Sequence, residues 1–226
     1  MTGMAEGAPA PLATGGGKAL RHAVILAHPD EGSFTASIAR TYADVVRSRG
    51  QEVVLRDLYR LHFDPVLKAD ERLPAAPFTP APDVAAELAA IEGSDIFVLV
   101  YPLWFGTPPA ILKGYIERVL GAGFAQPGQY RHGPPHPLLG GKQLLSFSSS
   151  GLSEQWLDRQ GVAQGLQATF DGYLARAFWM DTPQHLHFGP IAADLDAVSA
   201  NEHLAAVRRQ AETMCDWMSR RSRPDQ

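Results

Sequence analysis

The feature that most constrains this fold is a pair of short, uninterrupted apolar runs, HAVILA at 22–27 and DIFVLVY at 95–101. Each run is too short for a stable helix and lacks a polar face, which is typical of a strand buried on both sides. After the first run, apolar residues recur at helical spacing over 34–46, with Ser33 placed to cap the helix and Gly50 placed to end it. A strand therefore leads directly into a helix.

The same alternation continues along the chain. Further strands are expected over 52–55, 143–147 and 184–188. Helices are expected over 84–91, after 109 with Ile111, Leu112, Tyr115, Ile116 and Val119 on the buried side, over 157–177, and at the C-terminal end with Leu204, Val207, Met214 and Met218. Apolar strands that alternate with helices need a parallel sheet covered on both faces. The sequence predicts an α/β fold with a doubly wound, five-stranded parallel sheet, whose ligand site lies beyond the carboxyl ends of the strands.

Composition limits the class of protein. We expect a flexible tail over 1–20, rich in Gly, Ala and Pro, and one domain over 21–226. A net charge of −4, with no basic stripe, argues against a nucleic-acid partner. No run reaches the roughly 18 apolar residues of a membrane span. The single cysteine, Cys215, leaves no internal disulfide, so we expect a cytoplasmic protein without a metal cage.

Three predicted strand-to-helix loops carry unusual residues: 28–35, 102–109 and 148–153. In the first, the N-terminus of a helix can hold a phosphate, although Ser33 alone is also a plain N-cap and His28 is equally a structural residue. In the second, Trp104 and Phe105 can stack on a planar ring or plug the end of the core. The third offers the hydroxyls of 148–150 and Gly151, which suit a ring's heteroatoms but also ordinary turns. Together, the three loops suit a nucleotide-shaped cofactor.

At these residues the chain resembles the NAD(P)H:quinone oxidoreductase family, the DT-diaphorase-like branch of flavodoxin-like flavoproteins. The matching segments are ILAHPDEGSFTASIA at 25–39, RDLY at 56–59, FDP at 63–65 and YPLWFGTPPAILKGYIERVL at 101–120. The resemblance implies a flavodoxin-like fold, a homodimer and a bound flavin. The residues it assigns to that flavin are His28, Ser33, Phe34 and Thr35 for the diphosphate region, Pro102, Leu103, Trp104 and Phe105 for the ring, and Ser148, Ser149, Ser150 and Gly151 where the family has Thr-Thr-Gly-Gly.

The chain departs from that family in two places. A Gln usually separates the Leu and Trp of the ring loop, whereas Leu103 precedes Trp104 directly, so the ring-contacting backbone is shifted by a residue. The Tyr and His that well-known members place after the third loop have no clear counterparts here. Trp104, Phe105, Tyr130 and Trp156 are the candidates for the substrate pocket, and the remaining histidines are interpreted as ordinary residues.

These observations predict a flavin-dependent enzyme that transfers hydride from NAD(P)H to a quinone or related acceptor by a ping-pong mechanism. FAD is favoured over FMN because of the closeness of segment 28–39 to the quinone reductases. One alternative is a zinc-dependent de-N-acetylase-like hydrolase, since AHPDE at 27–31 resembles the AHPDD motif, although Glu31 replaces a metal-binding Asp, and His185 and His187 lack the expected spacing. Another alternative is a non-catalytic flavin-binding regulatory subunit.

Overall fold

A single parallel sheet organises the chain, for which the computed structural model describes residues 19–71, 79–122, 138–192 and 194–221. Its strands are β1 (Arg21–Leu26), β2 (Glu52–Asp57), β3 (Ile96–Pro102), β4 (Gln143–Ser149) and β5 (Gln184–Phe188). They pair in the order β2-β1-β3-β4-β5, and every pairing is parallel. The order reverses between β1 and β3, which confirms the predicted doubly wound sheet and locates its switch point.

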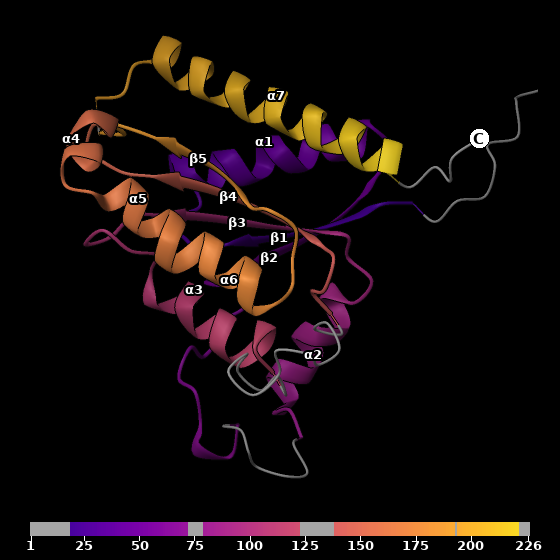
Figure 1. Cartoon of the computed structure of the whole chain (residues 1–226). Coiled ribbons are helices and arrows are strands. Elements are labelled where there is room, and N and C mark those ends of the chain that lie inside the picture. Colours follow the sequence, from indigo (N-terminus) through magenta and orange to yellow (C-terminus); the bar gives the residue numbers. More distant parts are fainter. Residues whose placement is uncertain (1–18, 72–78, 123–137, 193, 222–226) are drawn as a thin grey trace, which may run out of the picture.

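Helices cover both faces of this sheet (Figure 1). Helices α1 (Phe34–Ser48) and α7 (Ala197–Arg221) share one face and pack against each other. The other face carries α2 (Pro82–Ile91), α3 (Ala110–Tyr115) with its π-helical continuation η2 (Ile116–Leu120), and the segments from α4 to α6. A short 3-10 turn, η1 (Ala69–Glu71), precedes α2.

A hydrophobic core lies on each face of the sheet, which explains why the strand sequences are continuous apolar runs. In β3, Phe97, Leu99 and Tyr101 face the core beneath α2 and α3, whereas Val98 and Val100 face the core beneath α1 and α7. Every residue of β3 is buried. A strand covered on both faces has no solvent side, so alternation of polar and apolar residues disappears.

One predicted boundary is wrong. Strand β4 continues to Ser149, so Ser148 and Ser149 belong to the sheet rather than to a loop. The helical region expected over 157–177 is confirmed, and it consists of α4 (Glu154–Arg159), α5 (Val162–Leu166), the π-helical η4 (Gln167–Asp171) and α6 (Gly172–Ala177). Gly161 adopts a left-handed φ of 71°, which interrupts a right-handed helix at that point.

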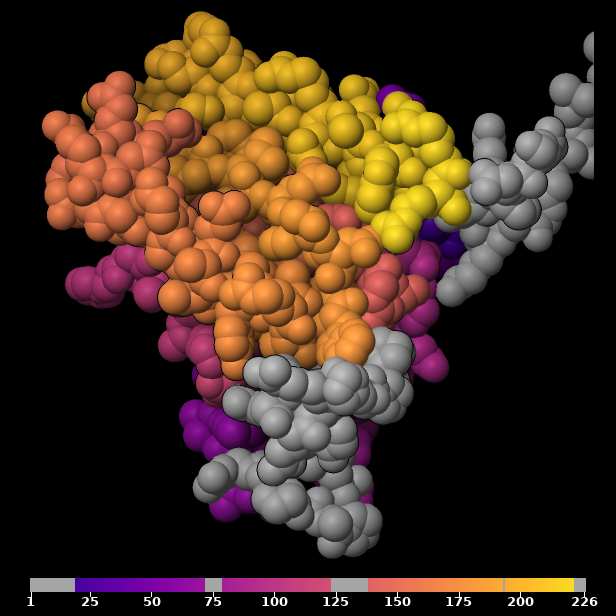
Figure 2. Space-filling model, in the orientation of Figure 1, coloured from indigo at the N-terminus to yellow at the C-terminus, as the bar shows by residue number. Residues whose placement is uncertain are grey.

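The broken helical segment forms one side of the molecule in Figure 2, where its orange atoms lie below the yellow α7. Most of the predicted tail, residues 1–18, lies outside the described residues. No helix in the described ranges is long and apolar enough to span a bilayer.

Candidate functional site

The loop from β1 to α1 is held rigid by its own polar groups. The amide of Asp30 donates to His28 Nδ1 over 3.0 Å, and the amide of Gly32 donates to the Asp30 carboxylate over 2.8 Å. Ser33 is the N-cap of α1, and its Oγ accepts the amide of Ala36 over 3.1 Å. In the described part of the chain the amides of Phe34 and Thr35 have no acceptor. Two oriented donors are therefore left at the positive end of a 15-residue helix.

This cap gives a first prediction. Replacing Ser33 with Ala removes the acceptor of the Ala36 amide, so we expect the free energy of unfolding to fall by about 1 kcal/mol. Urea denaturation monitored by circular dichroism measures the change. Ser48→Ala serves as the control, because the Ser48 hydroxyl donates only to the Val45 carbonyl near the exposed end of the same helix. Equal losses in the two variants would contradict the capping role.

The loop from β3 to α3 is a tight turn with two exposed rings. Trp104 and Thr107 exchange amide-to-carbonyl hydrogen bonds of 3.0 and 3.1 Å, and Phe105 and Gly106 between them have φ values of 52° and 79°. Trp104 is 40% exposed and Phe105 is fully exposed, so neither ring plugs the core. The amides of Phe105 and Gly106 meet no acceptor among the described residues. The turn therefore presents aromatic faces and free donors at the switch edge of the sheet.

The end of β4 uses its serine hydroxyls internally. Because side chains alternate along a strand, Ser148 and Ser149 point to opposite faces. Ser149 Oγ lies 2.8 Å from Thr35 Oγ1, which joins β4 to the start of α1, and the amide of Leu103 donates to the Ser149 carbonyl over 2.7 Å. Gly151, just beyond the strand, has an amide without an acceptor in the described ranges. Backbone amides, more than hydroxyls, are thus available here.

The loops after β3 and β4, together with α4 and the start of α5, line a cavity of about 390 Å³. Its walls include Leu103, Phe105, Gly106, Ser150, Gly151 and Trp156. We call it the rim cavity. The structure brings together predicted residues from the second and third loops here, with Trp156, while the His28 ring packs at 6.2 Å from the Trp104 ring at the same edge. Tyr130 lies outside the described residues.

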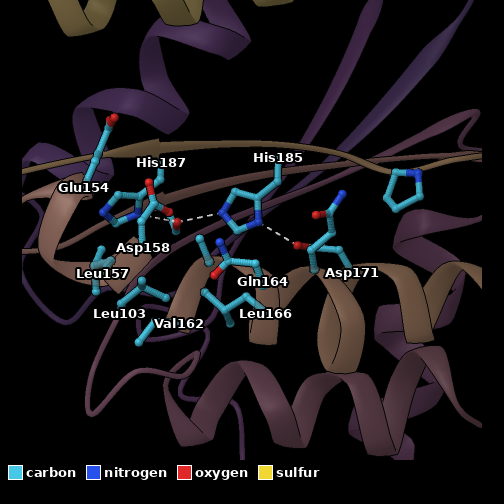
Figure 3. Close-up of a pocket in the computed structure, with 14 residues that line it drawn as sticks. Leu103, Glu154, Leu157, Asp158, Val162, Gln164, Leu166, Asp171, His185 and His187 are labelled. Carbon is cyan, nitrogen blue, oxygen red and sulfur yellow. Dashed lines mark hydrogen bonds and ion pairs between the residues drawn. The ribbon is translucent and has the colours of Figure 1, made fainter. Parts of the chain in front are cut away.

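A second cavity of about 400 Å³ adjoins the first and shares Leu103, Leu157 and Val162 with it. We call it the inner cavity. Its walls combine the end of β4, strand β5 and the segments α4 to η4. Figure 3 shows the rings of His185 and His187 projecting from β5 into this space, with Asp171 beside His185 and Asp158 beside His187.

The sequence interpretation missed these two histidines. Ser148 Oγ lies 2.7 Å from His185 Nε2 and 2.8 Å from His187 Nδ1, and His185 Nδ1 lies 2.6 Å from Asp171 Oδ2. Burial, and to a smaller extent the like charge of His185, lowers the pKa of His187 to about 4. The opposite charge of Asp158 acts in the other direction. The available signal was their spacing, since residues two apart on a strand share a face.

The described residues contain no group of three His, Cys, Asp or Glu side chains placed to hold a metal ion. His28 Nδ1, in the AHPDE segment, is occupied by the Asp30 amide. The zinc-hydrolase alternative therefore gains no support from the geometry.

Comparison with known proteins agrees with this architecture. Residues 21–213 match the family described as flavodoxin-like fold. An uncharacterized NAD(P)H oxidoreductase of Haemophilus influenzae is 33% identical over 85% of this chain and 96% of its own length. NAD(P)H dehydrogenase [quinone] 1 of Cavia porcellus is 32% identical over 64% of this chain, and the match spans 58% of that relative. The solved NAD(P)H:quinone oxidoreductase of Methanothermobacter marburgensis superposes with a TM-score of 0.77 at 22% identity, covering 87% of this chain and 99% of the other.

Proposed function

Because this chain belongs to the flavodoxin-like fold family, we propose that it is a flavin-dependent oxidoreductase that passes two electrons from NAD(P)H to a quinone or related acceptor. The observation that carries the proposal is a set of amides at one sheet edge that meet no acceptor among the described residues, contributed by Phe34, Thr35, Phe105, Gly106 and Gly151. Free donors converging beside exposed aromatic rings suit a planar ring with polar edges and an anionic tail.

The residues present fit such a group. In our proposal the amides of Phe34 and Thr35 hold the phosphate region at the start of α1, where the helix dipole favours negative charge. Trp104 packs on the ring, and the amides of Phe105, Gly106 and Gly151 donate to its polar edge. When bound, the flavin supplies the hydride chemistry. The chain itself binds and orients the flavin and excludes water from it. Leu103, Leu157 and Val162, which line both cavities, exclude the water.

The proposal extends to the cofactor, the oligomeric state and the cellular location. We propose FAD, with FMN as the alternative, because segment 28–39 resembles the quinone reductases. We also propose a homodimer in the cytoplasm. The location is supported by cysteine usage, because the single Cys215 leaves no disulfide to form within the chain, as is usual in a reducing compartment. Mass spectrometry of the released cofactor and light scattering of the purified protein test the first two points.

Anaerobic spectroscopy of the purified protein tests the function. We expect a yellow protein whose visible absorbance is bleached by NADH or NADPH and restored by menadione or benzoquinone. A colourless protein with stoichiometric zinc would overturn the proposal in favour of the hydrolase. A flavin-loaded protein whose visible absorbance neither NADH nor NADPH bleaches would favour the non-catalytic regulatory role.

A further inference from the structure

Five side chains form one continuous series of hydrogen bonds between the two cavities. Asp171 Oδ2 meets His185 Nδ1, His185 Nε2 meets Ser148 Oγ, and Ser148 Oγ meets His187 Nδ1, at 2.6, 2.7 and 2.8 Å. His187 Nε2 then lies 3.1 Å from Ser150 Oγ. We call these five residues the serine–histidine relay. Each link joins atoms that can exchange donor and acceptor roles, which is the requirement for moving a proton along the series.

The two ends of the relay differ in their surroundings. Asp171 is 1% exposed, and its other carboxylate oxygen accepts the Ser146 hydroxyl over 2.6 Å. Ser148, in the middle, is fully buried. Ser150 lines the rim cavity, which receives the polar edge of the flavin ring in our proposed function, whereas Asp171, His185 and His187 line the inner cavity. The relay therefore connects an interior carboxylate to the reaction space without using bulk water at its centre.

The sheet itself fixes these positions. His185 pairs with Ser146 and His187 pairs with Ser148 in the register of β4 and β5, so the four side chains lie on one face. Asp171 comes from η4, which lies against β5. Tyr101 packs edge-on against the His185 ring at 6.2 Å. Packing alone does not require two imidazole rings, two hydroxyls and a carboxylate in one buried cluster. Each buried polar group costs free energy unless its hydrogen-bond partners are present, so apolar side chains would fill this space at lower cost.

We propose that the serine–histidine relay holds one proton in the interior and delivers it through Ser150 to the oxygen of the acceptor, an inference that rests on the proposed function. Reduction of a quinone to a hydroquinone needs a hydride and one further proton. The Ser150 hydroxyl, which donates to the Leu152 carbonyl in the structure, turns to the acceptor oxygen, gives up its proton and takes one from His187 Nε2. His187 Nδ1 takes one from Ser148, and Ser148 takes one from His185 Nε2. His185 keeps the proton on Nδ1 that it shares with Asp171.

The protonation state of His187 agrees with this role. Its pKa of about 4, lowered by burial first, keeps the ring neutral near pH 7, so it can accept a proton on one nitrogen as it releases one from the other. The groups that face the two rings are Tyr101 from β3, Asp158 and Glu154 from α4, and Asp171 from η4. Water entering the inner cavity returns a proton to His185 Nε2 and exchanges the His187 proton from Nδ1 back to Nε2, which resets both rings after turnover.

Stopped-flow measurement of the two half-reactions tests the relay in the flavin-loaded protein. In Ser150→Ala and His187→Gln we expect oxidation by benzoquinone to slow at least about tenfold, while reduction by the nicotinamide changes by less than about twofold. Ser150→Thr keeps the hydroxyl and should restore the rate. Glu154→Gln, in the same cavity but outside the relay, is the matched control. Wild-type quinone rates in both Ser150→Ala and His187→Gln would overturn the relay, whereas failure of nicotinamide reduction in the wild type would overturn the proposed function.

A second measurement needs no turnover. In protein labelled with ¹⁵N-histidine, we expect the ring nitrogen signals at neutral pH to show His187 with its proton on Nε2, directed at Ser150, and with Nδ1 accepting from Ser148. Ser148→Ala should shift the Nδ1 signal of His187 without changing the circular dichroism spectrum. A His187 proton on Nδ1 in the wild-type protein would overturn the relay whatever the enzyme's activity.

Discussion

Replacing Trp104 with Ala is expected to weaken flavin binding roughly 10- to 100-fold, because the indole is the larger of the apolar surfaces on which the ring packs in the proposed site. The stability of the flavin-free protein should change by less than about 1 kcal/mol, since Trp104 is 40% exposed and its main ring contact is His28. Titration of flavin into stripped protein, followed by fluorescence quenching, gives the dissociation constant.

Trp179→Ala is the matched control. Trp179 is 41% exposed, but its carbonyl accepts the Gly141 amide at the amino end of β4, the opposite edge of the sheet. Trp179→Ala removes the same type of side chain at nearly the same exposure. Comparison of the two variants therefore separates the loss of a flavin contact from the general effect of removing an exposed indole. A dissociation constant that is unchanged in Trp104→Ala, or raised equally in both variants, would place the ring elsewhere.

The sequence predicted the sheet well because its strands carry a local signal. The runs at 22–27 and 95–101 are apolar on both faces, and the structure buries both faces between separate helical layers. Ser33 as the cap of α1 was likewise readable, because a cap acts on amides within three residues. The predicted ligand edge follows from the same alternation, since parallel strands all end at one side.

What could not be predicted depends on residues far apart in the chain. The hydroxyl of Ser148 acquires its role only when β5 pairs beside β4 and sets His185 and His187 opposite Ser146 and Ser148. Strand register is a tertiary property, so a cluster of serines resembles a turn when only its neighbours are considered. Asp171 was hidden for a related reason, because its partners Ser146 and His185 lie on β4 and β5, far from it in the chain.

Replacing Gly114 with Ala is expected to lower the free energy of unfolding by about 2–3 kcal/mol, although Ala normally favours a helix. Gly114 lies in α3 beneath the FDP segment at 63–65. A methyl group there would lie 2.5 Å from Pro65 Cα and closer still to the Pro65 carbonyl oxygen, so backbone has to move. That movement would also disturb the Phe63 ring, which packs edge-on against Tyr115 at 5.2 Å. Urea unfolding with an unchanged m-value measures the loss.

Gly165→Ala makes the same substitution in α5, where the added methyl would meet nothing within 4 Å. Here only the backbone entropy of the unfolded chain and the helix propensity change, so we expect the free energy of unfolding to rise by about 0.5–1 kcal/mol. The two variants thus shift stability in opposite directions, because close approach of the 63–65 backbone requires glycine at 114 and nothing comparable requires it at 165. A gain in both variants would show that 63–65 does not dock on α3 as described, and the FDP segment would then lose its structural explanation.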